Sequence, residues 1–178
     1  DSHLPQEFVK NGDGAFYGSH YFSWDPSDPT GASGNPLRDG KFHFGPAWDF
    51  DGSAGNPCCD SSTEYFASTE DWIMRGTGSG STDATYRTQW FAQLFKDAAF
   101  EAAVEQRWAE VRTEFEKVFT TEVAGAKAAI GVGAANDRNR WASEPKPRAS
   151  RGTYNQEVAF VQNWYEDRFA WMDAQLTN

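Results

Sequence analysis

Apolar side chains recur every three to four residues through the middle of the chain, which is the period of an α-helix with one face in a core. The clearest run consists of Phe100, Val104, Trp108, Val111 and Phe115. Glu and Arg dominate the positions between them, so the opposite face is either an ordinary solvated surface or a site that recruits a basic partner. Asp97 precedes the run and is a suitable N-terminal cap.

Three further segments predict helices on the same grounds. Residues 87–96 and 154–176 each place apolar side chains on one face. Residues 121–132 are rich in small side chains and end near two glycines, so we expect a helix that packs closely against a neighbour. Two prolines interrupt residues 136–151, which we interpret as a solvated linker or as a basic patch for an anionic partner.

The first third of the chain carries a strand pattern instead. Residues 41–44 alternate polar with aromatic side chains, as a half-buried strand does, and Gly45-Pro46 then ends the pairing. Residues 21–24 are rich in aromatic side chains with β propensity, and residues 25–36 between the two segments have turn composition. The pattern predicts an antiparallel hairpin with a long loop. Residues 58–85, rich in Ser, Thr and Gly, predict a mobile surface loop that is a lid or a plain connector.

Two acidic residues directly follow the second strand. If the chain stays extended there, Asp49 and Asp51 point to one side and Phe50 to the other. Magnesium in phosphate-transfer sites is held by one or two carboxylates plus substrate oxygens, which such a pair could supply. Pairing of the two strands would bring Asp13, in the turn sequence that starts at Asn11, near both acids. Plain turn chemistry and a structural calcium site remain open as alternative interpretations.

Composition narrows the classes of function. A chain of 178 residues suits one domain over residues 1–178, and its oligomeric state is not set by the sequence. A formal net charge of −10 argues against nucleic-acid binding, which needs a basic surface. There is no apolar run long enough for a transmembrane helix. Cys58 and Cys59 are adjacent, and a bond between neighbours strains the peptide, so we expect them reduced or joined separately to partners.

The three histidines do not form a recognisable metal or nucleophile site. We expect His3 in a frayed start and His43 facing outward, which leaves His20, close to Asp13, as the histidine with a functional interpretation. Ser19 and His20 diverge in a strand and do not make a catalytic pair. No spacing of His, Cys and carboxylates matches a zinc site, and no Gly-x-Ser-x-Gly turn is present.

Several motifs together resemble the CotH kinase family, an atypical kinase fold named for spore coat protein H. They are Asn11-x-Asp13, Ser19-x-Tyr21-Phe22, Gly45-Pro46-Ala47-Trp48-Asp49-Phe50-Asp51, Asp71-Trp72-Ile73 and the aromatic run over residues 90–108. The resemblance covers nearly the whole chain, and the element that ends at Asp51 is its most specific part.

The resemblance implies a secreted or cell-surface bacterial protein that transfers phosphate from ATP to Ser or Thr of a protein substrate, with Mg²⁺ or Mn²⁺. Its implied fold is α+β: the helix-rich C-terminal lobe of a kinase-like domain, with a short hairpin carrying the acidic site. By position Asp13 matches the catalytic-loop aspartate and Asp49 the metal-binding aspartate, with Asp51 where the glycine of Asp-Phe-Gly would stand. Second metal or nucleotide contacts would come from Asn11, Ser19 and His20.

Two departures from the family pattern support an alternative. Gly18, followed by Ser19, stands where family members carry a second metal-binding asparagine. Ten residues precede Asn11, so we expect the nucleotide-binding lobe in a preceding part of a longer protein. The alternative is a kinase-like binding module without turnover on the bacterial surface, with a structural Ca²⁺ site. A preceding lobe with a glycine-rich loop and a paired lysine would favour the enzyme.

Overall fold

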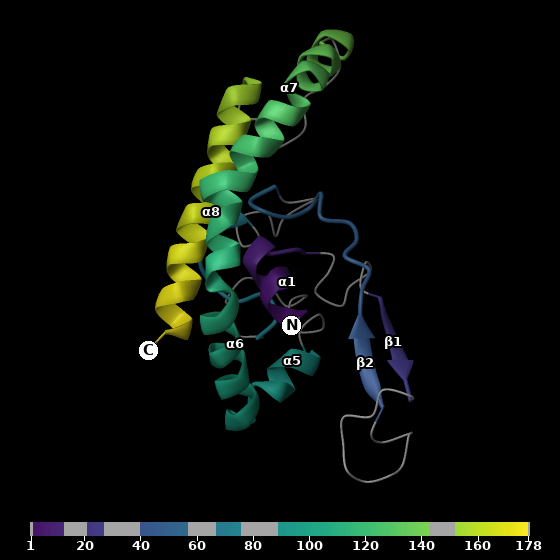
Figure 1. The fold of residues 1–178 in the computed structure, drawn as a ribbon, viewed down its shortest axis with the longest axis vertical. Coiled ribbons are helices and arrows are strands. Elements are labelled where there is room, and N and C mark those ends of the chain that lie inside the picture. Colours follow the sequence, from purple (N-terminus) through teal and green to yellow (C-terminus); the bar gives the residue numbers. More distant parts are fainter. Residues whose placement is uncertain are drawn as a thin grey trace.

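The computed structural model describes residues 2–12, 21–26, 40–56, 67–75, 89–142 and 152–177 (Figure 1). Its helices are α1 (His3–Val9), α5 (Gln89–Leu94), α6 (Ala98–Lys117), α7 (Val123–Arg140) and α8 (Tyr154–Leu176). A π-helical turn, η1 (Val118–Glu122), joins α6 to α7, and the strands are β1 (Phe22–Asp25) and β2 (Lys41–Phe44). The described part is therefore helix-rich with one small sheet, which confirms the α+β prediction at this level.

Helices α6 and α8 lie side by side and carry the main core (Figure 1). Both begin as the sequence predicted, because Asp97 accepts a hydrogen bond from the N–H of Ala99 at 2.9 Å and Thr153 forms a capping box with Gln156. The buried members of the main core cluster are Leu4, Phe8, Trp72, Val104, Trp108, Met172 and Leu176. Helix α1 thus packs its apolar side against the α6–α8 pair.

The expected third helix does not stop at its glycines. Helix α6 continues through η1 into α7, and α7 runs on to Arg140 and extends beyond the rest of the molecule (Figure 1). Helix α7 does contact α8, and Tyr154 of α8 donates to the carbonyl of Lys127, but the glycines are not at this contact. Helix α7 buries no side chain, and added Cβ atoms at Gly125, Gly131 and Gly133 would meet nothing within 4 Å. The many alanines around these glycines sustain the helix, since alanine has the strongest helix propensity.

The start of the chain is not frayed, contrary to expectation. His3 opens α1, is 4% exposed, and lies against Phe91 and Phe95 with ring centroids 5.0 Å apart in both pairs. Neither ring nitrogen has a hydrogen-bond partner. Burial, with a smaller contribution from the charge of Arg75, lowers the pKa of His3 from 6.5 to about 3. The imidazole is therefore neutral in the folded protein at pH 7.

A pH dependence of stability follows from this buried histidine. Between pH 6.5 and about 3 the unfolded chain takes up a proton at His3 and the folded chain does not, so the free energy of unfolding falls as the pH falls through that window. We expect His3→Leu to flatten this fall, measured by urea unfolding at several pH values. Substitution of exposed His43 is the control, and an unchanged acid profile in His3→Leu would contradict the assignment.

The predicted hairpin is present, and β1 pairs antiparallel with β2, with Phe22 opposite Phe44 and Trp24 opposite Phe42. The expectation of a half-buried strand was wrong, because Phe42 and Phe44 are 47% and 41% exposed. His43 is exposed, as predicted. The aromatic side chains of the two strands pack on one another rather than into the core, as in the contact of Trp24 with Phe42 at 4.8 Å.

Part of the predicted surface loop is core. Residues 67–75 are described, and Trp72, Ile73 and Met74 in them are buried at 7%, 2% and 0% exposure. The Ser- and Gly-rich composition of the surrounding sequence concealed this short apolar run. Cys58, Cys59 and the rest of the predicted loop lie outside the described residues.

Candidate functional site

The acidic loop after β2 turns sharply at its first acid. Asp49 has a backbone φ of 61°, in the left-handed region, so the predicted extended arrangement of residues 49–51 is wrong. Asp and Asn adopt this conformation more readily than other residues with a side chain. The side chains of Asp49 and Asp51 are both exposed. The loop therefore presents two carboxylates to solvent.

Hydrogen bonds fix this loop by its main chain. The carbonyl oxygens of residues 49–51 each accept a hydrogen bond from a different side chain. The donors, in that order, are the side chains of Asn11 (3.3 Å), Ser53 (2.5 Å) and Asn56 (2.8 Å). These three bonds end on backbone oxygens and not on carboxylates, so the loop can hold its shape while its acids contact a ligand.

Helix α1 is joined to the acidic loop at its C-terminal end. Asn11 is fully buried and reaches the loop from just beyond the helix, whose last turn is closed by Lys10 in a left-handed conformation (φ 51°). The N–H of Ala54 donates to the carbonyl of Val9 at 2.7 Å. The position of α1 therefore sets the position of Asn11 and, through it, of Asp49.

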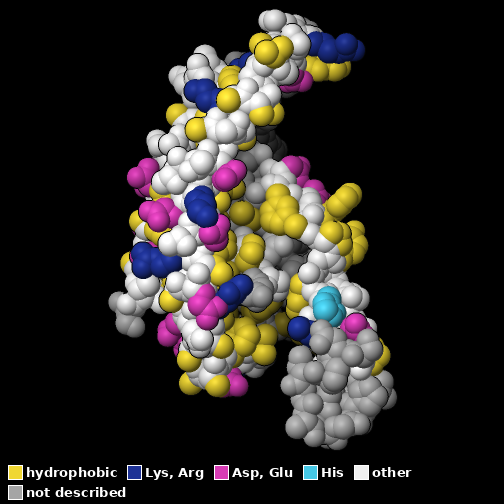
Figure 2. All heavy atoms as spheres, viewed as in Figure 1, with side chains coloured by type: hydrophobic (Ala, Val, Ile, Leu, Met, Phe, Trp, Pro, Cys, Tyr) yellow, Lys and Arg dark blue, Asp and Glu magenta, His cyan; other side chains and the backbone are white. Residues whose placement is uncertain are grey.

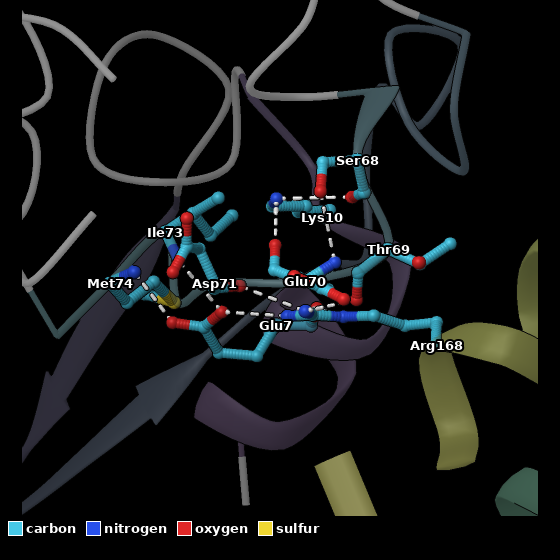
Figure 3. A network of polar contacts seen from close by, with 9 residues as sticks. All are labelled: Glu7, Lys10, Ser68, Thr69, Glu70, Asp71, Ile73, Met74 and Arg168. Atoms are coloured by element: carbon cyan, nitrogen blue, oxygen red, sulfur yellow. Dashed lines mark hydrogen bonds and ion pairs between the residues drawn. The ribbon is translucent and has the colours of Figure 1, made fainter. Parts of the chain in front are cut away.

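A buried charge network, formed by Glu7, Lys10 and Arg168, joins α1 to residues 67–75 and to α8 (Figure 3). Glu7 and Arg168 are both fully buried and form an ion pair at 3.3 Å. The carboxylate of Glu7 also accepts the N–H groups of Ile73 at 2.9 Å and Met74 at 2.5 Å. Glu7 thereby ties α1 to both α8 and the buried segment 67–75.

The two cations of the network hold the same segment by its carbonyl groups (Figure 3). Arg168 donates to the main-chain oxygens of Glu7 at 2.8 Å, Thr69 at 2.9 Å and Asp71 at 2.8 Å. Lys10 donates through Nζ to the carbonyl oxygens of Ser68, at 3.1 Å, and Glu70. Burial, reinforced by the positive charge of Arg168, lowers the pKa of Lys10 from 10.5 to about 7.

Sequence reasoning missed all three members of the buried charge network. Arg168 falls four residues after Trp164 and four before Met172, and all three side chains are buried on one stripe of α8. A charged residue within an apolar stripe was the available signal, because such a residue must find partners inside the protein. Glu7 and Lys10 gave no comparable signal, since no helix was expected at the start of the chain.

The structure tests the predicted site residues only in part. Asn11 and Asp49 are brought together, and Asp51 lies on the same loop. Asp13, Ser19 and His20 lie outside the described residues, so their proximity to the acids remains a prediction. Within the described ranges, no three His, Cys, Asp or Glu side chains could together hold a metal ion. Exposed carboxylates are of the ligand type that magnesium takes in phosphate-transfer sites, where substrate and water supply the remaining ligands, so magnesium binding at this loop stays a prediction.

Comparison with known proteins adds one finding. No curated protein and no solved structure matches the chain. Of the helices in the described ranges, none is long and apolar enough to cross a membrane. The sequence does match the family described as CotH kinase protein over residues 5–172, from α1 into the last turns of α8. The match takes in the buried charge network and the acidic loop, and the chain belongs to the CotH kinase family.

Proposed function

We propose that this chain is the helix-rich C-terminal part of a protein kinase domain that transfers phosphate from ATP to Ser or Thr of a protein substrate. Family membership indicates a kinase-like function in general. The observation that carries the finer proposal is the acidic loop, whose main chain is fixed by three side-chain donors while its two carboxylates are exposed.

In this proposal Asp49 and Asp51 hold Mg²⁺ and the phosphate groups of ATP supply further oxygen ligands. The metal would neutralise negative charge on the phosphates. Asp13, matched by position in the sequence, would accept a hydrogen bond from the acceptor hydroxyl and orient it. Asn11 positions the loop through the carbonyl of Asp49, and the buried charge network positions Asn11.

The proposal extends to the rest of the protein. A kinase of this kind also needs a nucleotide-binding lobe, because kinases cover the phosphates with a separate loop and pair them with a lysine. Secretion or attachment to a bacterial cell surface agrees with the family's association with the spore coat.

The test is calorimetric titration of ATP with Mg²⁺ into the longest natural form of the protein that contains these residues. Asp49→Asn is the preferred variant, because Asn adopts the left-handed backbone at this position more readily than Ala does. We expect Mg²⁺-dependent ATP binding that weakens about tenfold or more in Asp49→Asn, since a metal ligand is lost.

Asp71→Asn is the matched control for this titration. Asp71 is also exposed and also left-handed, with φ of 67°, but it lies outside the acidic loop. We expect its variant to bind Mg²⁺ and ATP as the wild type does. Calcium binding without any binding of nucleotide would refute the kinase proposal and favour a binding module with a structural Ca²⁺ site. Phosphate transfer from labelled ATP to casein then tests turnover directly.

A further inference from the structure

An apolar groove lies between the hairpin and the helices, on the side of β2 that faces α1, α5 and α6. It encloses about 680 Å³ and is lined by residues from all four elements. Figure 2 shows hydrophobic side chains gathered in the recess between the hairpin and the helices, with Lys or Arg atoms beside it. The volume lies within the range of about 300–1,000 Å³ that is typical of ligand sites.

The groove exposes large apolar side chains. Trp90 is 65% exposed, Phe42 47% and Leu94 42%, and all three line the same cavity. Its deeper wall includes Phe91, which is 5% exposed. Contiguous exposed apolar surface of this kind marks binding sites in soluble proteins.

The two charged side chains that line the groove are both basic, and each has an acidic neighbour outside the lining, Asp25 opposite Lys41 and Glu110 beside Arg107. Lys41 and Arg107 line it together with His3 and His43, and none of its described lining residues is Asp or Glu. In a chain with 26 acidic and 16 basic residues, this is a local reversal of charge. Arg107 also pairs with Glu110 at 2.8 Å, but Glu110 is not part of the lining. Such a surface complements an apolar partner that carries negative charge.

His3 adds an unused polar group to the wall. It is 4% exposed, and neither of its ring nitrogens has a hydrogen-bond partner. A neutral imidazole retains one N–H donor and one acceptor. Buried polar groups without a partner are uncommon and costly, so a hydrogen bond supplied by a ligand would offset this cost.

The groove continues toward the acidic loop. A smaller cavity of about 130 Å³ shares Ser2, Pro5 and Phe44 with the large one, and its lining extends to Phe50, the residue between the two acids. A compact ligand would fill the large cavity alone. An extended peptide could occupy both cavities and carry a hydroxyl group toward the acidic loop.

From these observations we propose that the groove docks an extended segment of the acceptor protein in which aromatic or Leu side chains alternate with Asp or Glu. The apolar side chains occupy the large cavity and the carboxylates face Lys41 and Arg107. The inference rests on the proposed kinase function for the nature of the partner, but docking itself needs neither nucleotide nor metal.

The test is fluorescence anisotropy with labelled synthetic peptides and no nucleotide. One peptide alternates Phe and Leu with Glu and Asp, and its counterpart has Lys at every acidic position. We expect the acidic peptide to bind about tenfold more tightly than the Lys peptide, and Trp90→Ala or Arg107→Glu to weaken its binding about fivefold or more. Both altered side chains are substantially exposed, so the fold should survive either change.

Matched controls lie at the C-terminal end of α7, outside the lining of the groove. Trp141 is 51% exposed and Arg140 lies beside it, so Trp141→Ala and Arg140→Glu remove the same kinds of group and should leave binding unchanged. Equal affinity for the two peptides, or binding that survives both groove variants, would overturn the proposal. Self-association of the chain that is lost in Trp90→Ala would also overturn it, by assigning the groove to a second copy.

The docking proposal and the kinase proposal can be refuted separately. A version of the acidic peptide with one added Ser tests both proposals: binding that depends on Trp90 and Arg107, without phosphate transfer to that Ser, would retain the groove and count against the kinase proposal. Transfer to that Ser that is insensitive to both groove variants would count against the groove and retain the kinase.

Discussion

Replacing Arg168 with Ala is expected to lower the free energy of unfolding by about 3–5 kcal/mol, the usual cost of removing one partner of a buried ion pair. The carboxylate of Glu7 would remain fully buried without its counter-charge, and the carbonyl groups of Thr69 and Asp71 would each lose a donor. Urea unfolding monitored by tryptophan fluorescence measures the change. A loss of this size is a large fraction of the stability of an ordinary domain.

The dependence of this loss on pH identifies its cause. Burial raises the pKa of Glu7, while Arg168 and the N–H groups of Ile73 and Met74 oppose that rise. Without Arg168 the pKa of Glu7 rises further, so the folded variant binds a proton that the unfolded chain binds only near pH 4.5. We therefore expect Arg168→Ala to recover part of its stability on mild acidification. A loss of stability that is independent of pH would indicate lost packing instead.

Two controls separate the buried pair from ion pairs in general. Lys117 and Glu114 form an exposed pair at 2.6 Å, and Lys117→Ala should cost no more than about 1 kcal/mol. The double variant Glu7→Gln with Arg168→Met removes both charges and should be more stable than Arg168→Ala, because no lone charge stays buried. The loss of stability in the double variant is compared with the losses in Glu7→Gln alone and Arg168→Met alone. If the two single losses add up to that of the double variant, a direct interaction is contradicted.

The buried charge network also explains why the sequence predicted the helices better than the site. Helical periodicity located α6 and α8 because their apolar side chains form regular stripes. The start of α1 lacks such a stripe: it buries His3 and Glu7 beside Leu4 and Phe8. Its helix is stabilised by tertiary contacts with α8 and residues 67–75, which no local pattern reports.

The acidic loop likewise combines features that a local sequence pattern predicts with features that depend on distant residues. The turn residues and the two acids after a strand predicted a loop that exposes both acids, while the metal-binding role that the family resemblance gives Asp49 stays a prediction. The left-handed turn at Asp49 and the three donors to the loop's carbonyl groups could not be predicted, because Asn11 lies 38 positions away in sequence. Long-range hydrogen bonds to the main chain leave no periodic signal.

Replacing Trp108 with Ala is the second change from which we expect a large loss, again about 3–5 kcal/mol, because truncation of a buried Trp leaves a cavity. Trp108 is fully buried; it stacks on Phe115, with centroids 5.3 Å apart, and its ring is tilted against that of Phe169 at 5.6 Å. Its indole N–H donates to Asp173 at 2.9 Å. Thermal and urea unfolding measure the loss.

Trp108→Phe separates packing from the hydrogen bond. The phenyl ring keeps most of the aromatic contact, and Asp173 keeps its ion pair with Arg112 at 2.7 Å, so we expect a loss of only about 1–2 kcal/mol. Trp90→Ala, at a position 65% exposed, should cost much less than either change.

Since Leu4 and Phe8 of α1 belong to the same core cluster as Trp108, Trp108→Ala should also loosen α1, detected as faster amide exchange at Asn11. Exchange at Asn11 no faster than in the wild type would show that the buried charge network alone holds α1 in place.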